Sequence, residues 1–161
     1  QPNLDQPLGG GPDVNLNVPG LIPEDYLPDV HARLILYKRI ANAADEDGLK
    51  DLQVEMIDRF GLLPEPTKNL VRMTSLKLKA EQLGIKKVDA GPQGGRIEFG
   101  ADTPVDPLAL IKLIQGQPNR YKFEGATLFK FTVPMERPEE RFNTLEALFE
   151  RLTPPPSKQS A

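Results

Sequence analysis

Three successive stretches in the first half of the sequence carry apolar residues at the spacing of an α-helix. They predict helices over residues 29–41, 48–60 and 64–83. Asp29 can cap the first helix, and Gly61 follows the second, where glycine accepts the left-handed conformation that ends a helix. The apolar side of the first helix is predicted to consist of Val30, Leu34, Tyr37 and Ala41.

The second half of the sequence changes to short stretches that alternate between apolar and polar residues around glycine-containing turns. This spacing is typical of β-hairpins, and a helix is expected after each hairpin. The first of these helices begins at Asp106-Pro107, a capping residue followed by a favoured first-turn proline, and the second spans 138–152. The predicted strand pairs are 86–90 with 96–99 and 121–123 with 128–133.

The order of these elements predicts an α+β fold, in which three N-terminal helices are followed by hairpin, helix, hairpin and helix, with a small antiparallel sheet. Residues 13–18 add a short strand signal. Residues 1–12 are rich in Pro, Gly, Gln and Asn and are expected to be a linker or disordered. Residues 13–152 then form a single α+β domain, and 153–161 a disordered tail.

The composition limits the chemistry that this chain can perform. Its 161 residues include 20 lysines and arginines, 23 acidic residues, no cysteine and one histidine, His31. Disulfides, thiolate metal sites and histidine-rich metal sites are therefore excluded. The near-neutral charge argues against a dominant nucleic-acid binder, and no apolar run reaches the roughly 18 residues of a membrane span. We expect a soluble, cytoplasmic, monomeric domain.

Sequence motifs for nucleotide binding or hydrolysis are absent from the chain, among them GxxxxGK[ST], GxGxxG, HExxH and GxSxG. The glycine-rich pieces at 9–11 and 91–95 lack the following helix that a phosphate cradle needs. We therefore expect no catalytic residue, no cofactor and no metal in this chain.

The helix predicted over 48–60 separates its polar from its apolar residues. On its polar side Asp51, Glu55 and Asp58 fall within about 60° of arc. Val54 lies among them, and Arg59 lies four residues after Glu55, where an ion pair can form. This side is either a solvated surface, as most charged helix faces are, or a docking patch for a basic surface with Val54 at its centre. The opposite side consists of Leu49, Leu52, Met56 and Phe60.

The segment Phe60-Gly61-Leu62-Leu63-Pro64 is predicted to be a buried corner between two helices. Phe60 ends the apolar side of its helix, Gly61 can take the left-handed conformation, and Pro64 prevents continuation of the helix.

Three segments together resemble a known family. They are Leu36-Tyr37-Lys38-Arg39-Ile40, Asp58-Arg59-Phe60-Gly61-Leu62-Leu63-Pro64 and Leu83-Gly84-Ile85. In this order they are similar to the C-terminal domain of bacterial transcription-repair coupling factor (Mfd). The resemblance covers roughly residues 13–152, nearly the whole of the chain expected to be ordered.

The resemblance implies a regulatory domain without chemistry of its own. The family's full chain is an ATP-driven DNA translocase that dislodges stalled RNA polymerase and recruits the repair protein UvrA. Its ATP and Mg²⁺ sites and its polymerase and DNA contacts belong to other domains. The family's C-terminal domain packs on a UvrB-like N-terminal module and covers the UvrA-binding surface, which holds the resting protein in an autoinhibited state.

The residues of that contact can be assigned by position in the family's motif. On this sequence they are Glu55, Asp58 and Arg59. Together with Asp51 and Val54 they form the expected partner-binding patch.

An accessory nucleic-acid-binding domain is the alternative function. It would use a basic stretch centred on the third helix, which Glu81 alone opposes. Lys77 and Lys79 point about 200° apart on a helix, which favours a solvated surface over a binding stripe. The basic residues are Lys68, Arg72, Lys77, Lys79, Lys86 and Lys87.

The aromatic residues of the second hairpin have two interpretations, a stacking platform for RNA bases or part of the core. The core is favoured because alternate strand positions must bury side chains. These residues are Tyr121, Phe123, Phe129 and Phe131.

Overall fold

The computed structural model describes residues 11–154, which divide into two compact units. Within the described residues the first unit comprises 18–78, and the second comprises 11–17 together with 79–154. The first unit is thus inserted along the chain between two parts of the second. The linker expected at 1–12 and the tail expected at 153–161 lie almost entirely outside the described residues. That residues 13–152 form a single domain stays a prediction.

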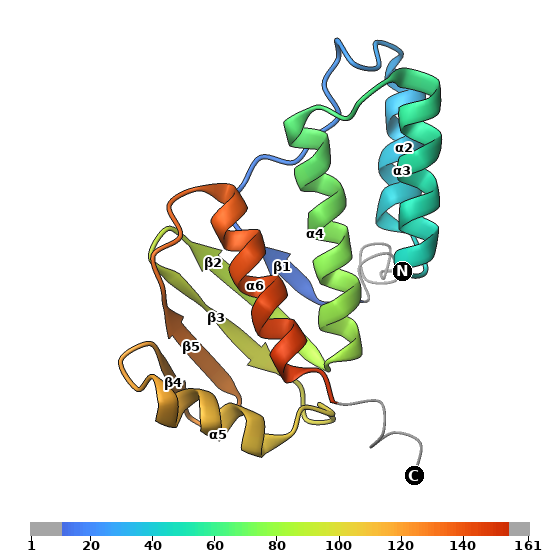
Figure 1. Cartoon of the computed structure of the whole chain (residues 1–161). Helices are drawn as coiled ribbons and strands as arrows, with labels where there is room; N and C mark the ends of the chain where they lie inside the picture. Colours follow the sequence, from blue (N-terminus) through green and yellow to red (C-terminus); the bar gives the residue numbers. More distant parts are fainter. Residues whose placement is uncertain (1–10, 155–161) are drawn as a thin grey trace, which may run out of the picture. The chain divides into compact units, whose positions relative to one another are not determined.

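The first unit contains the three predicted helices, α2 (Val30–Ala41), α3 (Glu46–Phe60) and α4 (Glu65–Gln82), whose last turn belongs to the second unit (Figure 1). Capping aspartates mark where α2 and α3 begin. Asp29 accepts a hydrogen bond of 3.1 Å from the backbone N–H of His31, and Asp45 accepts one of 2.8 Å from Gly48. These carboxylates satisfy backbone donors that a helix start leaves without partners.

The apolar side predicted for α2 is wrong in part. Val30 and Leu34 are 57% and 55% exposed, whereas Leu36 and Ile40 are buried. The helix packs through the side that meets α3, so the spacing of its apolar residues did not identify the buried side. The core of the unit consists of Ile22, Leu27, Leu36, Ile40, Leu49, Leu52, Met56, Leu63 and Val71.

The second unit contains a five-stranded sheet in the order β1-β2-β3-β5-β4. Both predicted hairpins are confirmed, β2 with β3 and β4 with β5, and the antiparallel pairing of β3 with β5 joins them. The sheet is nevertheless mixed, because β1 pairs in parallel with β2 and places Val14 opposite Val88. The strands are β1 (Asp13–Asn15), β2 (Ile85–Gly91), β3 (Gly94–Phe99), β4 (Tyr121–Glu124) and β5 (Leu128–Thr132).

Two helices complete the second unit, α5 (Pro107–Gly116) and α6 (Pro138–Leu152). They contact each other, α5 also contacts β4, and Figure 1 shows α6 running across the sheet. The sheet buries alternate residues, including Val88, Ile97, Phe129 and Phe131. Of the aromatic residues of the second hairpin, Tyr121, Phe129 and Phe131 are buried, as the sequence predicted, whereas Phe123 is half-buried and meets the Phe129 ring edge-on. The buried side of α6 consists of Arg141, Phe142, Leu145, Leu148, Phe149 and Leu152.

Arg141 is the unexpected member of that buried set. Its Nε donates to the carbonyl oxygen of Met135 at 2.9 Å, and Nη2 donates to that of Glu136 at 2.8 Å. Nη1 reaches the carbonyl oxygens of Leu16 and Asn17 at 3.2 and 3.1 Å. Among the described residues no carboxylate forms an ion pair with this guanidinium, so four backbone oxygens hold it. These bonds connect the start of α6 to the chain directly after β1.

We expect Arg141→Met to lower the free energy of unfolding by about 2–4 kcal/mol, because it removes charge-assisted hydrogen bonds and leaves buried carbonyl groups without donors. Urea denaturation followed by circular dichroism measures the change. Arg151→Met is the matched control, since Arg151 is exposed on the same helix, and it should stay within about 0.5 kcal/mol of the parent. Equal stability of the two variants would contradict the role assigned to Arg141.

Candidate docking site

An ion-pair network on α2 and α3 organises the predicted docking patch. The two carboxylate oxygens of Glu55, on α3, each accept a hydrogen bond of 2.8 Å from the guanidinium of Arg39, on α2. Arg59, one turn along α3, donates to Glu55 Oε2 at 3.1 Å. One carboxylate therefore pairs with two arginines from two helices. A two-pronged pairing of this kind constrains both direction and distance.

The network changes the proton affinity of its central carboxylate. The hydrogen bonds from Arg39, and next from Arg59, lower the pKa of Glu55 from 4.5 to about 2 and outweigh the opposing effect of desolvation. The same pairing raises the pKa of Arg39. Glu55 is thus ionised at every physiological pH, and its charge is already compensated within the first unit. Its place in the patch is to orient the arginines.

Arg59 also covers the aromatic residue that ends α3. Its guanidinium carbon lies 4.8 Å from the centre of the Phe60 ring, and Tyr26 meets the same ring edge-on with centroids 6.0 Å apart. The Tyr26 hydroxyl donates to the carbonyl oxygen of Gly61 at 2.8 Å. These contacts hold the end of α3, where Tyr26 and Phe60 pack against the core of the first unit.

The prediction of a buried corner after α3 is therefore wrong for most of its residues. Phe60 is only half-buried, Leu62 is 83% exposed and Leu63 alone is buried. Gly61 does end the helix as predicted, with a φ of 101°. The ψ angle of Gly61 is −177°, and the next residue, Leu62, lies at the surface.

The remaining residues of the predicted patch lie on the open side of α3. Val54 is 62% exposed, and Asp51 and Asp58, one turn on either side of it, are exposed as well. Within residues 11–154 neither of these two aspartate side chains forms a hydrogen bond or ion pair. Two carboxylates and an apolar side chain are therefore available to a partner, beside two arginines that Glu55 orients.

Two residues of this surface were missed by the sequence analysis. Arg39 lies 16 positions before Glu55, and nothing in the local spacing of charges connects the two residues. Asp47, an exposed residue one turn before Asp51, extends the acidic side of α3 towards its N-terminus. Its spacing from Asp51, Val54 and Asp58 is that of one helix face. Helical periodicity in the sequence could therefore have identified Asp47.

The structure locates the other candidate residues of the chain. Among the described residues no group of three His, Asp or Glu side chains is placed to hold a metal ion, and His31 is exposed. No helix in the described part of the chain is long and apolar enough to cross a membrane. Of the basic stretch, Lys68 and Arg72 lie on α4 in the first unit, while Lys86 and Lys87 lie on β2 in the second.

We expect the Glu55 carboxylate to titrate near pH 2. Because its pKa in the folded chain lies below its ordinary value of 4.5, the ion pair contributes its full stability above about pH 4.5, and this contribution is lost as the pH falls towards 2. NMR of the side-chain carboxyl carbon measures the titration. Arg39→Ala should raise the pKa towards 4.5, while Lys38→Ala, an exposed control on the same helix, should not. A wild-type pKa near 4.5 would contradict the network.

Comparisons with known proteins place these features in a family. The TRCF domain family matches residues 16–110 of this chain. The transcription-repair-coupling factor of Haemophilus influenzae is 50% identical over 131 residues, which are 81% of this chain and 11% of that protein. The transcription-repair-coupling factor of Escherichia coli is 39% identical over 152 residues, 94% of this chain and 13% of that protein. The chain thus spans roughly a tenth of the length of these relatives.

A solved structure has the same fold. The crystal structure of a C-terminal domain of transcription-repair coupling factor superposes with a TM-score of 0.74 and covers 88% of this chain and 91% of its own. At 21% sequence identity, this likeness concerns the fold alone. The family match and the identity to the two relatives show the membership: the chain belongs to the TRCF domain family of transcription-repair coupling factors.

Proposed function

We propose that this chain is a non-catalytic docking domain of a transcription-repair coupling factor and acts in transcription-coupled DNA repair. In the proposal it binds the UvrB-like N-terminal module of the same protein and covers the surface that UvrA recognises. It thereby restrains the ATP-dependent DNA translocase, whose ATP, Mg²⁺, polymerase and DNA contacts belong to other domains. The resting protein is autoinhibited until this contact opens.

The observation that supports the proposal most strongly is the composition of the open side of α3. Val54 is 62% exposed between Asp51 and Asp58, which form no ion pair within residues 11–154. An exposed apolar side chain surrounded by charges suits a specific interface, in which the apolar contact excludes water and the charges select the partner. The partner surface is expected to place basic side chains opposite the two aspartates.

Glu55 makes this surface ready for docking. Because it already orients Arg39 and Arg59, these long side chains lose less conformational freedom when a partner binds. The two arginines then offer donors to carboxylates of the partner next to the acidic stripe. A contact within one chain also benefits from a high effective concentration, so a weak interface is enough to keep the protein closed.

The test is a triple variant of the full-length protein, Glu55→Ala with Asp58→Ala and Arg59→Ala. Removing these charges should release the docked module, so binding of UvrA and the basal ATPase rate should both rise. The three side chains are at least partly exposed, so the fold should survive the change. Pull-down of UvrA, ATP hydrolysis and thermal melting give the three readouts.

A second triple variant serves as the control. Asp102→Ala, Glu139→Ala and Arg151→Ala remove the same kinds of side chain from exposed positions of the second unit and should leave UvrA binding unchanged. If the Glu55 variant stays folded but binds UvrA no better than wild type, the docking contact does not depend on these residues, and a solvated helix face is the better account of them.

Nucleic-acid binding by the basic stretch stays a prediction, and no observation favours it over docking. Its lysines and arginine are distributed over two units, with Lys68, Arg72 and Lys77 in the first and Lys79, Lys86 and Lys87 in the second. Phosphate binding would fall steeply with salt concentration, so a titration with duplex DNA at two ionic strengths tests this alternative directly.

A further inference from the structure

The sheet of the second unit has a buried side and an open side. Figure 1 shows α6 running across one side. Along β3, β5 and β4, residues buried in the core alternate with residues that are exposed or half-buried. This alternation assigns every charged residue of the three strands to the open side. They are Arg96, Glu98, Lys122, Glu124 and Lys130.

The strand register brings basic side chains together on the open side. Arg96 lies opposite Lys130, which in turn lies opposite Lys122. The backbone N–H of Thr132 donates to the carbonyl oxygen of Arg120 at 2.7 Å, so the exposed Arg120 continues β4 by one residue beside this row. Neighbouring strands are about 4.8 Å apart, and residues on one side of a strand are about 7 Å apart. We call these four closely spaced cations the basic sheet patch: Arg96, Arg120, Lys122 and Lys130.

The carboxylates of the three strands lie at one end of this face. Glu98 and Glu124 occupy the next row of the sheet. Glu124 Oε2 accepts a hydrogen bond of 3.0 Å from Lys130 Nζ. The hydrogen bond and the charge of Lys130 lower the pKa of Glu124, and the charges of Lys122 and Arg96 add to this effect. A single carboxylate is therefore close enough to interact with three of the four cations.

Three of the four cations have no ion pair of their own. Within residues 11–154 the side chains of Arg96, Arg120 and Lys122 form no hydrogen bond or ion pair, and Asp89, which lies opposite Arg96 on β2, does not pair with it either. Like charges directly opposite each other on neighbouring strands destabilise a sheet, so this row does not serve stability. The whole chain has a net charge of −3, so its composition does not account for the cluster.

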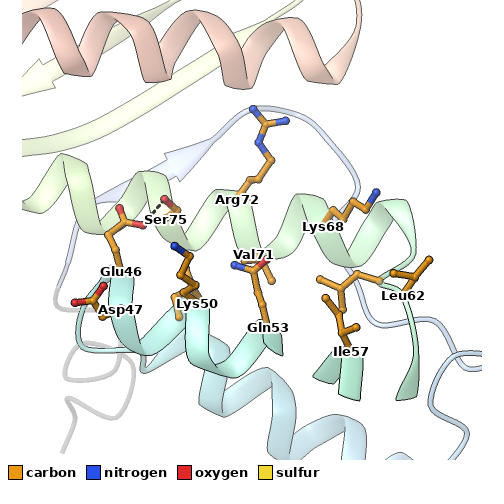
Figure 2. Close-up of a pocket in the computed structure, with 12 residues that line it drawn as sticks. Glu46, Asp47, Lys50, Gln53, Ile57, Leu62, Lys68, Val71, Arg72 and Ser75 are labelled. Atoms are coloured by element: carbon orange, nitrogen blue, oxygen red, sulfur yellow. Dashed lines mark hydrogen bonds between the residues drawn. The ribbon is translucent and has the colours of Figure 1, made fainter. Parts of the chain in front are cut away.

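The groove between α3 and α4 in the first unit shows the opposite arrangement of charge. Figure 2 shows Lys50 and Lys68 in the same lining as Glu46 and Asp47, so the groove selects neither sign of charge. In the two rows of the basic sheet patch, no carboxylate interrupts the cations on β3, β5 and β4. The basic sheet patch therefore selects an anion.

The open side of the sheet fits a nucleic-acid duplex better than a single strand. Proteins hold single strands by stacking the bases on aromatic side chains. The aromatic residues of these strands are on the other side, where Tyr121, Phe129 and Phe131 are buried. A duplex keeps its bases paired and presents its phosphates outward, where separate cations on a surface can neutralise them.

We propose that the basic sheet patch binds the phosphate backbone of duplex DNA, independently of its sequence. The guanidinium and ammonium groups pair with phosphate oxygens, and Glu124 orients Lys130 at the edge of the contact. The choice of DNA rests on the proposed role in DNA repair. The contact adds to those that other domains of the protein make with DNA, and it does not depend on docking by the first unit.

The test measures binding of fluorescein-labelled nucleic acids to the 161-residue chain by fluorescence anisotropy. Two duplexes of unrelated sequence should bind equally, and the corresponding single strand more weakly. Neutralising about three phosphates predicts a slope of about −2.7 in log affinity against log salt, so a rise from about 50 to 200 mM salt should weaken binding about 40-fold. A labelled polyglutamate peptide should bind more weakly than the duplex, because its charges are less dense.

Two triple variants locate the site. The first removes the cations of the patch that lack an ion pair: Arg96→Gln, Arg120→Gln and Lys122→Gln. It should weaken duplex binding at least about tenfold and reduce the salt slope by about 1 for each cation removed. The second removes the same number of exposed cations from the basic stretch and should leave the affinity unchanged: Lys68→Gln, Lys77→Gln and Lys86→Gln. Thermal melting verifies that both variants stay folded, as expected for exposed positions.

Equal losses in the two variants, a dependence on sequence, tighter binding of the single strand or of the acidic peptide, or no binding at low salt would overturn the proposal. None of these results bears on the docking patch, because UvrA binding by the full-length protein tests that contact separately.

Discussion

Arg141 fixes the chain at the point where a long inserted segment begins. The strand β1 has three residues and pairs in parallel with β2, and the whole first unit lies between these strands along the sequence. Closing so large a loop has an entropic cost that three residues of pairing offset poorly. The guanidinium adds bonds to Leu16 and Asn17, and the Asn17 side chain donates to the carbonyl oxygen of Ala90 at 2.7 Å. These bonds fix Leu16 and Asn17, the residues of the second unit that directly precede the first unit in the chain.

The helix α3 has three sides in different surroundings. Its buried side, with Leu49, Leu52 and Met56, belongs to the core of the first unit. A second side holds Glu55, whose carboxylate connects α3 to α2 through Arg39. A third side, around Val54, is left open. Because the first two sides fix the helix, the open side presents its charges on a rigid support, which favours selective binding over non-specific attraction.

The open side of α3 carries unpaired carboxylates although the whole chain has a net charge of only −3. Overall charge therefore says little about what this domain binds. Glu55 is compensated by Arg39 where α3 meets α2, whereas Asp51 and Asp58 lie on the open side of α3. Salt screens the interactions between charges beyond about 10 Å, so the local arrangement of charge matters more for binding than the net charge.

The helices and hairpins could be predicted from the amino-acid sequence, because the signals that start and end them act within a few residues. Capping by Asp29 and Asp106, the stop at Gly61 and the polar side of residues 48–60 all depend on neighbours in the chain. Three features became visible only in the folded chain: the buried side of α2, the pairing of Arg39 with Glu55 across 16 positions, and the bond from Arg141 to Leu16 across 125 positions. The tertiary structure also decided the parallel position of β1 and the exposure of Leu62. These features depend on packing between distant segments, and local spacing contains no information on which segments meet.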